Sequence, residues 1–180
     1  MSQATCSFEL IDADTPPCPW LAALRTLFNE YAHWLQVDLC FQGFEAELAS
    51  LPGAYARARG GALLLARSGQ ELAGCVGLRA LEPGMCEMKR LWVREPFRRS
   101  GLGRRLALTV IERACGFGYE AMRLDTLERM EAARRLYAAL GFREVPRYYD
   151  NPLADAIYLQ KSLRPGPQGA AGGSRSEAPR

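Results

Sequence analysis

A basic segment with two glycines, in the middle of the chain, carries residue types suited to binding an anion. It reads Arg98-Arg99-Ser100-Gly101-Leu102-Gly103 and follows a polar stretch that contains Pro96. Apolar residues at helical spacing come after it, so we expect a loop that opens a helix. A helix N-terminus presents unpaired N–H groups and the positive end of its dipole, and glycine lets the backbone approach a ligand closely. We therefore predict a site for a phosphate or pyrophosphate group, with the two arginines adding positive charge.

Two nucleotide-binding motifs and a turn without a ligand are alternatives for this segment. The P-loop pattern fails because Arg104 and Arg105 follow Gly103, where Lys and Ser or Thr are required. The dinucleotide fingerprint fails at Leu106, where its third glycine belongs, although Asp125 ends the next predicted strand at about the right distance. A tight strand-to-helix turn would also use glycine, so the glycines alone leave that interpretation open.

Three motifs in this half of the chain follow one another in the order and spacing of a known family. Arg98-x-x-Gly101-x-Gly103 matches the signature R/Q-x-x-G-x-G/A. Residues 87–93 look like the family's strand before that signature, and residues 133–142 have its later pattern A-x-x-L-Y-x-x-x-G-F. On these motifs, residues 8–163 resemble the GCN5-related N-acetyltransferase (GNAT) superfamily.

The resemblance implies acetyl-CoA as the acyl donor and assigns its contacts to individual residues. The pyrophosphate would be bound mainly by backbone N–H groups of the loop Arg98, Arg99, Ser100, Gly101, Leu102 and Gly103. The preceding strand ends in Leu91, Trp92 and Val93, and its backbone would pair with the pantetheine arm through Leu91 and Val93. Many members of the family have an Asn seven residues before the Tyr that matches Tyr137, and this Asn contacts the cofactor. This chain has Met130 there, so that contact is not expected.

Tyr137 and Glu87 are the catalytic candidates. Tyr137 matches the position of the family's usual general acid, which protonates the departing CoA thiolate, although a purely packing role is the alternative. An alkyl amine has a pKa of about 10.4 and attacks a thioester only when unprotonated, so a base is required. We expect Glu87 to act as that base through water, the alternative being an ion-pair partner for Lys89 or Arg90. A backbone N–H on the Leu91 strand would stabilise the oxyanion.

Candidate substrate contacts lie on two other segments. Arg79, at the end of a predicted strand, would meet an acidic group of the substrate or would simply be exposed. Tyr148 and Asn151 belong to a polar, aromatic loop after Pro146, and loops often carry specificity. His33 lies on an amphipathic helical segment and is interpreted as structural.

Composition excludes several other classes of protein. The 180 residues carry a formal net charge of only +3, partly in the C-terminal tail, so nucleic-acid binding is not expected. Six cysteines without C-x-x-C spacing and a single histidine predict reduced thiols and no metal site. No apolar run approaches the roughly 20 residues of a membrane span, and no signal peptide is evident. We expect a cytoplasmic protein with no membrane partner.

The elements that must position these residues follow from changes of apolar periodicity. Strands are expected over residues 8–11, 62–67, 71–81, 85–93, 121–126, 142–145 and 156–160. Helices are expected over residues 21–35, 44–51, 102–117 and 130–140. This order predicts an α/β domain over residues 6–163 and, on the resemblance, a GNAT fold. That fold has a mixed, mostly antiparallel sheet of about six to seven strands flanked by about four helices. Residues 164–180 are rich in Pro and Gly and are expected to form a disordered tail.

The sequence thus predicts an N-acetyltransferase that moves an acetyl group from acetyl-CoA to a primary amine of a small molecule or amino acid derivative. Direct attack without a covalent enzyme intermediate is expected, because there is no G-x-S-x-G motif and no assignable Cys–His pair. A protein N-terminal or lysine acetyltransferase, and a non-catalytic acyl-CoA-binding module, are the alternatives. Similar proteins are commonly dimers, so a homodimer is a further expectation, without an assignable interface.

Overall fold

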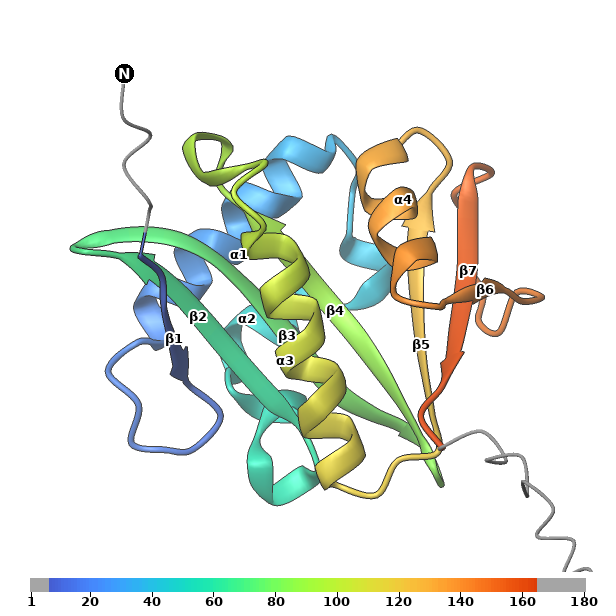
Figure 1. Cartoon of the computed structure of the whole chain (residues 1–180), viewed down its shortest axis with the longest axis horizontal. Coiled ribbons are helices and arrows are strands. Elements are labelled where there is room, and N and C mark those ends of the chain that lie inside the picture. The colour runs from blue at the N-terminus through green and yellow to red at the C-terminus, as the bar shows by residue number, and fades with distance from the viewer. Residues whose placement is uncertain (1–6, 165–180) are drawn as a thin grey trace, which may run out of the picture.

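Strands and helices follow one another along the chain in the predicted order, and the structure, a computed structural model, describes residues 7–164 (Figure 1). The strands are β1 (Glu9–Asp12), β2 (Ala62–Ser68), β3 (Glu71–Glu82), β4 (Met85–Val93), β5 (Ala121–Leu127), β6 (Arg143–Glu144) and β7 (Ala156–Ser162). The α-helices in this part are α1 (Leu21–Leu35), α2 (Phe44–Ser50), α3 (Leu102–Gly116) and α4 (Glu131–Ala139). The seven strands form one sheet in the order β1-β2-β3-β4-β5-β7-β6, antiparallel except between β4 and β5. The predicted α/β architecture is confirmed.

Helices cover both faces of this sheet, with α3 in front and α1 and α2 behind it in Figure 1. The side chains of β2 show why the strand is apolar throughout. Leu63 and Leu65 belong to the core under α1, whereas Leu64 and Ala66 belong to the core under α3. Successive strand residues point to opposite faces, so a strand covered on both sides is apolar at every position.

One predicted strand is shorter in the structure. Residues 142–145 were expected to pair, but β6 comprises only Arg143 and Glu144, which pair with β7. Phe142 instead packs into the core at 2% exposure. Pro146 has no N–H for a further ladder bond, which ends the pairing on the other side.

Strands β4 and β5 separate soon after they begin. They pair only at Met85–Ala121, Cys86–Met122 and Glu87–Arg123, and then diverge toward the top of Figure 1. In the described part of the chain, the rest of β4, residues 88–93, therefore has no strand on its β5 side. A backbone edge whose N–H and C=O groups have no strand partner within residues 7–164 lines the resulting gap.

A bulge in β4 accompanies this separation. Trp92 pairs with Cys75 and Lys89 pairs with Gly77, so two β4 residues, Arg90 and Leu91, stand opposite a single residue of β3. Arg90 has a φ of +56°, a left-handed conformation that is strained for a side chain of this size. A bulge bends and twists a strand, which directs the end of β4 away from β5.

Several sequence expectations concern other features of the described part. Within residues 7–164 no helix has the length and apolar composition that a membrane span requires. Cys75 and Cys86 are free thiols buried in the core, where they pack as small apolar residues. The predicted disordered tail lies outside the described residues except for Arg164, and so does Cys6 at the expected start of the domain.

Candidate active site

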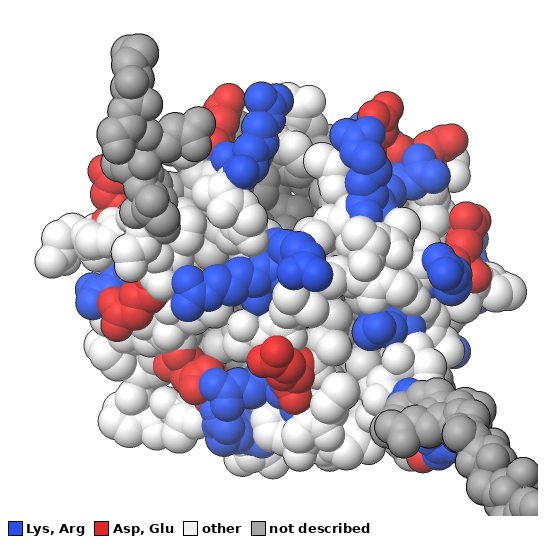
Figure 2. Space-filling model, in the orientation of Figure 1, with Lys and Arg blue, Asp and Glu red and all other residues white. Residues whose placement is uncertain are grey.

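The N-terminus of α3 presents backbone N–H groups without acceptors. Gly101 and Arg99 adopt positive φ angles of 84° and 64°, which turn the chain sharply into the helix. The first helical bond runs from the Arg105 N–H to the Gly101 carbonyl oxygen at 3.0 Å. Within residues 7–164 the N–H groups of Gly103 and Arg104 therefore have no acceptor. Between this terminus and α4 the surface is hollowed, with Lys and Arg side chains on both sides (Figure 2).

Two residues of the predicted phosphate loop serve the loop itself. The Ser100 hydroxyl donates to the Phe97 carbonyl at 2.6 Å and accepts a long hydrogen bond of 3.4 Å from the Leu102 N–H. The Leu102 side chain is 1% exposed and belongs to the core under α3. Both residues hold the helix terminus in place, which leaves anion contacts to the glycine and arginine positions.

The Arg98 side chain lies across the end of β4. Its guanidinium carbon is 5.1 Å and 4.8 Å from the ring centroids of Trp34 and Trp92. Its Nε donates to the Val93 carbonyl oxygen at 3.1 Å. Arg99 is exposed beside it. The loop thus brings positive charge to the point where the open edge of β4 meets the helix terminus.

The exposed edge of β4 consists of alternate residues. Val93 stands opposite Gly74. The hydrogen bond to β3 is made by the next residue, because the Arg94 N–H donates to the Ala73 carbonyl at 2.9 Å. The N–H and C=O of Val93 therefore point away from β3 and into the gap, where Leu91 also lies.

Trp92 does not face this edge, and its assignment as a cofactor contact stays a prediction. Its backbone pairs with Cys75 of β3. Its ring is 8% exposed and packs with Tyr31 and Trp34 of α1, at centroid distances of 6.0 Å and 5.1 Å. The strand alternation turns Trp92 toward the helical layer, so it supports the edge from behind.

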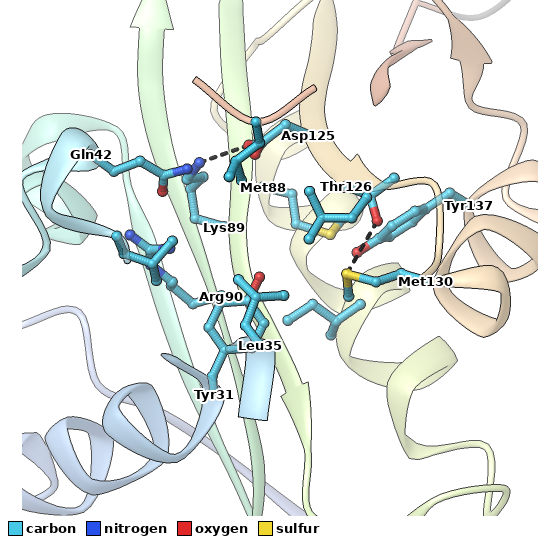
Figure 3. A pocket seen from close by; sticks show the side chains of 14 residues that line it. Tyr31, Leu35, Gln42, Met88, Lys89, Arg90, Asp125, Thr126, Met130 and Tyr137 are labelled. Atoms are coloured by element: carbon cyan, nitrogen blue, oxygen red, sulfur yellow. Dashed lines mark hydrogen bonds and ion pairs between the residues drawn. The ribbon is translucent and has the colours of Figure 1, made fainter. Parts of the chain in front are cut away.

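A narrow cavity of about 40 Å³ occupies the gap between β4 and β5 (Figure 3). Tyr137 of α4, Thr126 and Met130 lie together at one end, and Gln42, Lys89 and Asp125 lie at the other. Tyr137 is 7% exposed, and burial, with smaller contributions from nearby groups, raises its pKa well above the ordinary value. Tyr137 therefore keeps its proton at neutral pH. Met130 accepts a hydrogen bond from the Thr126 hydroxyl at its sulfur, 3.7 Å away.

The opposite end of this cavity is a buried polar network. Lys89 Nζ lies 2.8 Å from Asp125 Oδ1, and the Tyr149 hydroxyl donates to Asp125 Oδ2 at 3.0 Å. The amides of Gln42 and Asn151 both donate to the Tyr149 oxygen, at 3.3 Å and 2.9 Å. Burial alone would raise the pKa of Asp125, but the adjacent Lys89 and Tyr149 hold it below its ordinary value. The network therefore carries a stable carboxylate–ammonium pair.

Asn151 has a different position from the one the sequence predicted. It is 4% exposed, and its side chain bonds the Tyr149 hydroxyl and the Leu153 N–H instead of lining the substrate cavity described next. Its role in the structure is to fix the loop that carries Tyr149.

A second cavity, of about 350 Å³, adjoins the first and shares Gln42 and Lys89 with it. Its lining combines charged, polar and apolar groups: Phe41, Gln42, Arg79, Leu81, Glu82, Glu87, Lys89, Arg123, Tyr148 and Tyr149. Arg79, Tyr148 and Glu87 thus come together in one cavity, although they lie on β3, on the loop after β6 and on β4. Its volume is within the range of small-molecule sites.

Glu87 is not free to act directly as a base. It is 1% exposed, and one carboxylate oxygen, Oε2, accepts from Arg79 Nε at 2.8 Å and lies 2.7 Å from a second Arg79 nitrogen. The other oxygen accepts from the Tyr148 hydroxyl at 2.8 Å and lies 3.8 Å from Lys89 Nζ. The Tyr148 hydroxyl thus stands on one carboxylate oxygen of Glu87, and the role of Glu87 as a base stays a prediction.

Several residues of the two cavities were absent from the sequence prediction. Arg123 and Asp125 alternate along β5 as Glu87 and Lys89 do along β4, and two such polar alternations within apolar strands are a signal that points to a shared polar face. Gln42 lies in a short 3₁₀ turn after α1, where the sequence carries no comparable signal.

Comparisons with known proteins agree with this geometry. Residues 19–142 match a family model described as acetyltransferase (GNAT) family. An uncharacterized N-acetyltransferase of Schizosaccharomyces pombe is 38% identical over 77% of this chain and 86% of its own. One from Dictyostelium discoideum is 30% identical over 78% of this chain and 94% of its own.

Solved structures show the same fold. An acetyltransferase of the GNAT family from Staphylococcus aureus Mu50 superposes with a TM-score of 0.72 at 21% identity. The superposition covers 88% of this chain and 100% of that one. The structure of yncA from Salmonella typhimurium with its cofactor acetyl-CoA has a TM-score of 0.67 at 19% identity, over 92% of this chain and 99% of its own.

Proposed function

This chain belongs to the acetyltransferase (GNAT) family, and on that premise we propose that it transfers an acetyl group from acetyl-CoA to the primary amine of a small molecule. One observation carries the proposal: the open edge of β4 leads from the unpaired N–H groups of α3 to a cavity that adjoins a second cavity. A donor can therefore lie along β4 while an acceptor enters from the other side.

The residues present fit the donor. The N–H groups of Gly103 and Arg104 and the charge of Arg99 suit a pyrophosphate. The outward N–H and C=O of Val93 suit the amides of a pantetheine arm, which would add to the sheet as a strand does. Acetyl-CoA, when bound, supplies the thioester that the amine attacks.

Two tyrosines carry the proton transfers. An amine that enters the 350 Å³ cavity meets the Tyr148 hydroxyl, which donates to Glu87. The amine proton passes to the Tyr148 oxygen as the Tyr148 proton passes to Glu87, so Tyr148 never has to remain ionised. Burial and the charge of Glu87 raise the pKa of Tyr148 far above its ordinary value, which agrees with a relay that stays protonated between transfers. Tyr137 holds its proton on the donor side and gives it to the departing thiolate.

The size of the second cavity favours a small acceptor. A volume of about 350 Å³ suits a compact molecule, and Tyr148 and Tyr149 close one wall. A protein substrate would have to present its amine through the same opening.

The test is release of free thiol from acetyl-CoA by the purified protein with a panel of primary amines, amino acids and lysine-containing or free N-terminal peptides. We expect turnover with at least one small amine, and an acetylated product one acetyl mass heavier. Turnover with peptides alone would assign a protein acetyltransferase instead. Binding of acetyl-CoA with no turnover on any acceptor would assign the non-catalytic module.

A further inference from the structure

Three charged side chains form a row across the floor of the 350 Å³ cavity. Glu87 of β4 pairs in register with Arg79 of β3 on one side and with Arg123 of β5 on the other. All three line the cavity. The row therefore places two guanidinium groups on either side of one carboxylate, at a position fixed by the sheet.

The two arginines are not equally neutralised. Arg79 Nε donates a hydrogen bond to Glu87, a second Arg79 nitrogen lies 2.7 Å from the same oxygen, and the Arg79 side chain is 32% exposed. Arg123 donates to Gln160 at 2.8 Å and to Glu82 at 3.1 Å, and Glu82 is 53% exposed, so this second ion pair is weakened by solvent. Within residues 7–164, one terminal nitrogen of each arginine, Nη1 of Arg79 and Nη2 of Arg123, has no acceptor.

The ring of Tyr148 holds Arg123 in place. The guanidinium carbon of Arg123 lies 4.9 Å from the centroid of that ring, and the Tyr148 hydroxyl is anchored on Glu87. A guanidinium that is stacked and already hydrogen-bonded loses little entropy when it binds an anion. Arg123 is thus a preorganised cation at the cavity wall.

An orphaned acceptor marks the other end of the cavity. Gln42 Oε1 is buried without a hydrogen-bond partner in the described part of the chain, and Gln42 borders both cavities. A buried carbonyl oxygen without a donor is costly, and an amine N–H would satisfy it. Gln42 stands beside Lys89, two residues along β4 from Glu87, so the arginine row lies roughly 7 Å further along the strand.

From these observations, and resting on the proposed function, we propose that the acceptor is an amino acid. Its amine binds between Gln42 and the Tyr148 hydroxyl, and its carboxylate binds the terminal nitrogens of Arg79 and Arg123 that have no acceptor within residues 7–164. The remaining lining of Phe41, Leu81, Tyr148 and Tyr149 is aromatic and apolar, which suits an apolar side chain. Arg123 is the residue that distinguishes an amino acid from the corresponding amine.

Matched acceptors test this directly. L-phenylalanine is compared with 2-phenylethylamine, and L-leucine with 3-methylbutylamine, because each pair differs only in the carboxylate. We expect kcat/KM to be about 10- to 100-fold higher for the amino acid, as for a charge-assisted pair of hydrogen bonds. In Arg123→Gln this preference should fall to near unity through a higher KM for the amino acid. Arg123→Lys should restore part of it.

Arg143→Gln is the matched control, since Arg143 also stands in register with Gln160 but is exposed and outside the cavity. It should leave the preference unchanged. Equal use of both members of each pair by the wild-type protein, or a preference that survives in Arg123→Gln, would overturn the proposal.

A binding measurement separates this proposal from the proposed function. N-acetyl-L-phenylalanine and N-acetyl-2-phenylethylamine are titrated into the protein with CoA present, and no reaction is needed. Tighter binding of the acid that is lost in Arg123→Gln supports the carboxylate site even if no amine is turned over, in which case the proposed activity alone fails. Equal binding of the two compounds would contradict the carboxylate site.

Discussion

The tyrosine hydroxyls of the site differ in whether their protons are already engaged. Tyr148 donates to Glu87 and Tyr149 donates to Asp125. Tyr137 has no acceptor among the described residues, although its ring is as buried as theirs or more so. Of these three tyrosines, Tyr137 is therefore the one that can give a proton without breaking a hydrogen bond within residues 7–164.

Replacing Tyr137 by phenylalanine tests this role. We expect kcat to fall by about 10²- to 10⁴-fold, the usual contribution of a general acid, while the KM for acetyl-CoA stays nearly constant. Steady-state kinetics with a good acceptor provide the measurement. Tyr119→Phe is the control, because its hydroxyl bonds the Gly60 carbonyl far from both cavities. Unchanged kcat in Tyr137→Phe would remove this residue from the chemistry.

The relay through Tyr148 predicts a change in pH dependence. Tyr148→Phe lacks the hydroxyl that would pass the amine proton to Glu87, so we expect only amine that is already unprotonated in solution to react. The kcat/KM of the variant should then rise tenfold per pH unit up to the pKa of the amine, about 10 for an alkyl amine. The wild-type profile should level off at lower pH. Superimposable profiles would show that Tyr148 carries no proton.

At the scale of elements, the bulge in β4 is held by a buried ion pair from α2. Arg90, the residue with positive φ, donates two hydrogen bonds to Glu47 at 3.0 Å and 2.6 Å, and the Tyr55 hydroxyl donates to the same carboxylate at 2.6 Å. The Phe44 ring lies 5.1 Å from the guanidinium carbon. This cluster stabilises the strained backbone from which the open edge of β4 begins.

Removing one partner should be costly. In Glu47→Ala the Arg90 side chain, 3% exposed, would be left without its counter-charge. We expect a loss of about 3–5 kcal/mol in the free energy of unfolding, measured by urea denaturation. Glu45→Ala, on the exposed side of the same helix, should change stability by less than about 0.5 kcal/mol. A loss below 1 kcal/mol for Glu47→Ala would mean that this pair does not hold the bulge.

The bounds of helices and strands were predictable where Pro or Gly residues mark them in the sequence. Pro-rich entry and apolar spacing fix α1 at Leu21–Leu35, and Glu82-Pro83-Gly84 starts β4 at Met85. The bulge was not predictable, because Arg90 carries no local sign of a left-handed conformation. The carboxylate that binds the Arg90 side chain belongs to Glu47, which lies 43 residues away in the sequence.

The whole molecule assembles its site from segments that are distant in sequence. The turn after α1, strands β3 to β5, helix α4 and the loop after β6 all contribute side chains to the two cavities. The anion loop could be predicted because one continuous motif encodes it. The Lys89–Asp125–Tyr149 network could not, since each member is an ordinary polar residue until the sheet brings the three together.

The buried, ion-paired carboxylates make the free energy of unfolding depend on pH in the acidic range. The pKa values of Glu47 and Asp125 lie below the ordinary 4.5 and 3.8, since Arg90 and Lys89 outweigh the opposing effect of burial. Both groups bind protons more weakly in the folded than in the unfolded state. Their stabilisation is therefore complete above about pH 5 and is lost as pH falls through the lowered values. The urea concentration at half-unfolding should decrease as the pH is lowered below about 4.5. This decrease should be less steep in Glu47→Gln. A midpoint that stays constant down to about pH 3 would contradict this assignment.

Binding of the donor should stabilise the molecule as a whole, because the α3 terminus and the edge of β4 exist only in the folded state. At about 100 times its Kd, acetyl-CoA should add roughly 2.7 kcal/mol, which for a chain of this size raises Tm by about 5–10 °C in a thermal-shift measurement. CoA should act similarly, and NAD should have no effect because Leu106 replaces the third glycine of its fingerprint. Stabilisation by NAD alone would assign the glycine loop to a dinucleotide. No shift with millimolar acetyl-CoA would mean that the fold persists here without its donor, and the amine-transfer proposal would fall with it.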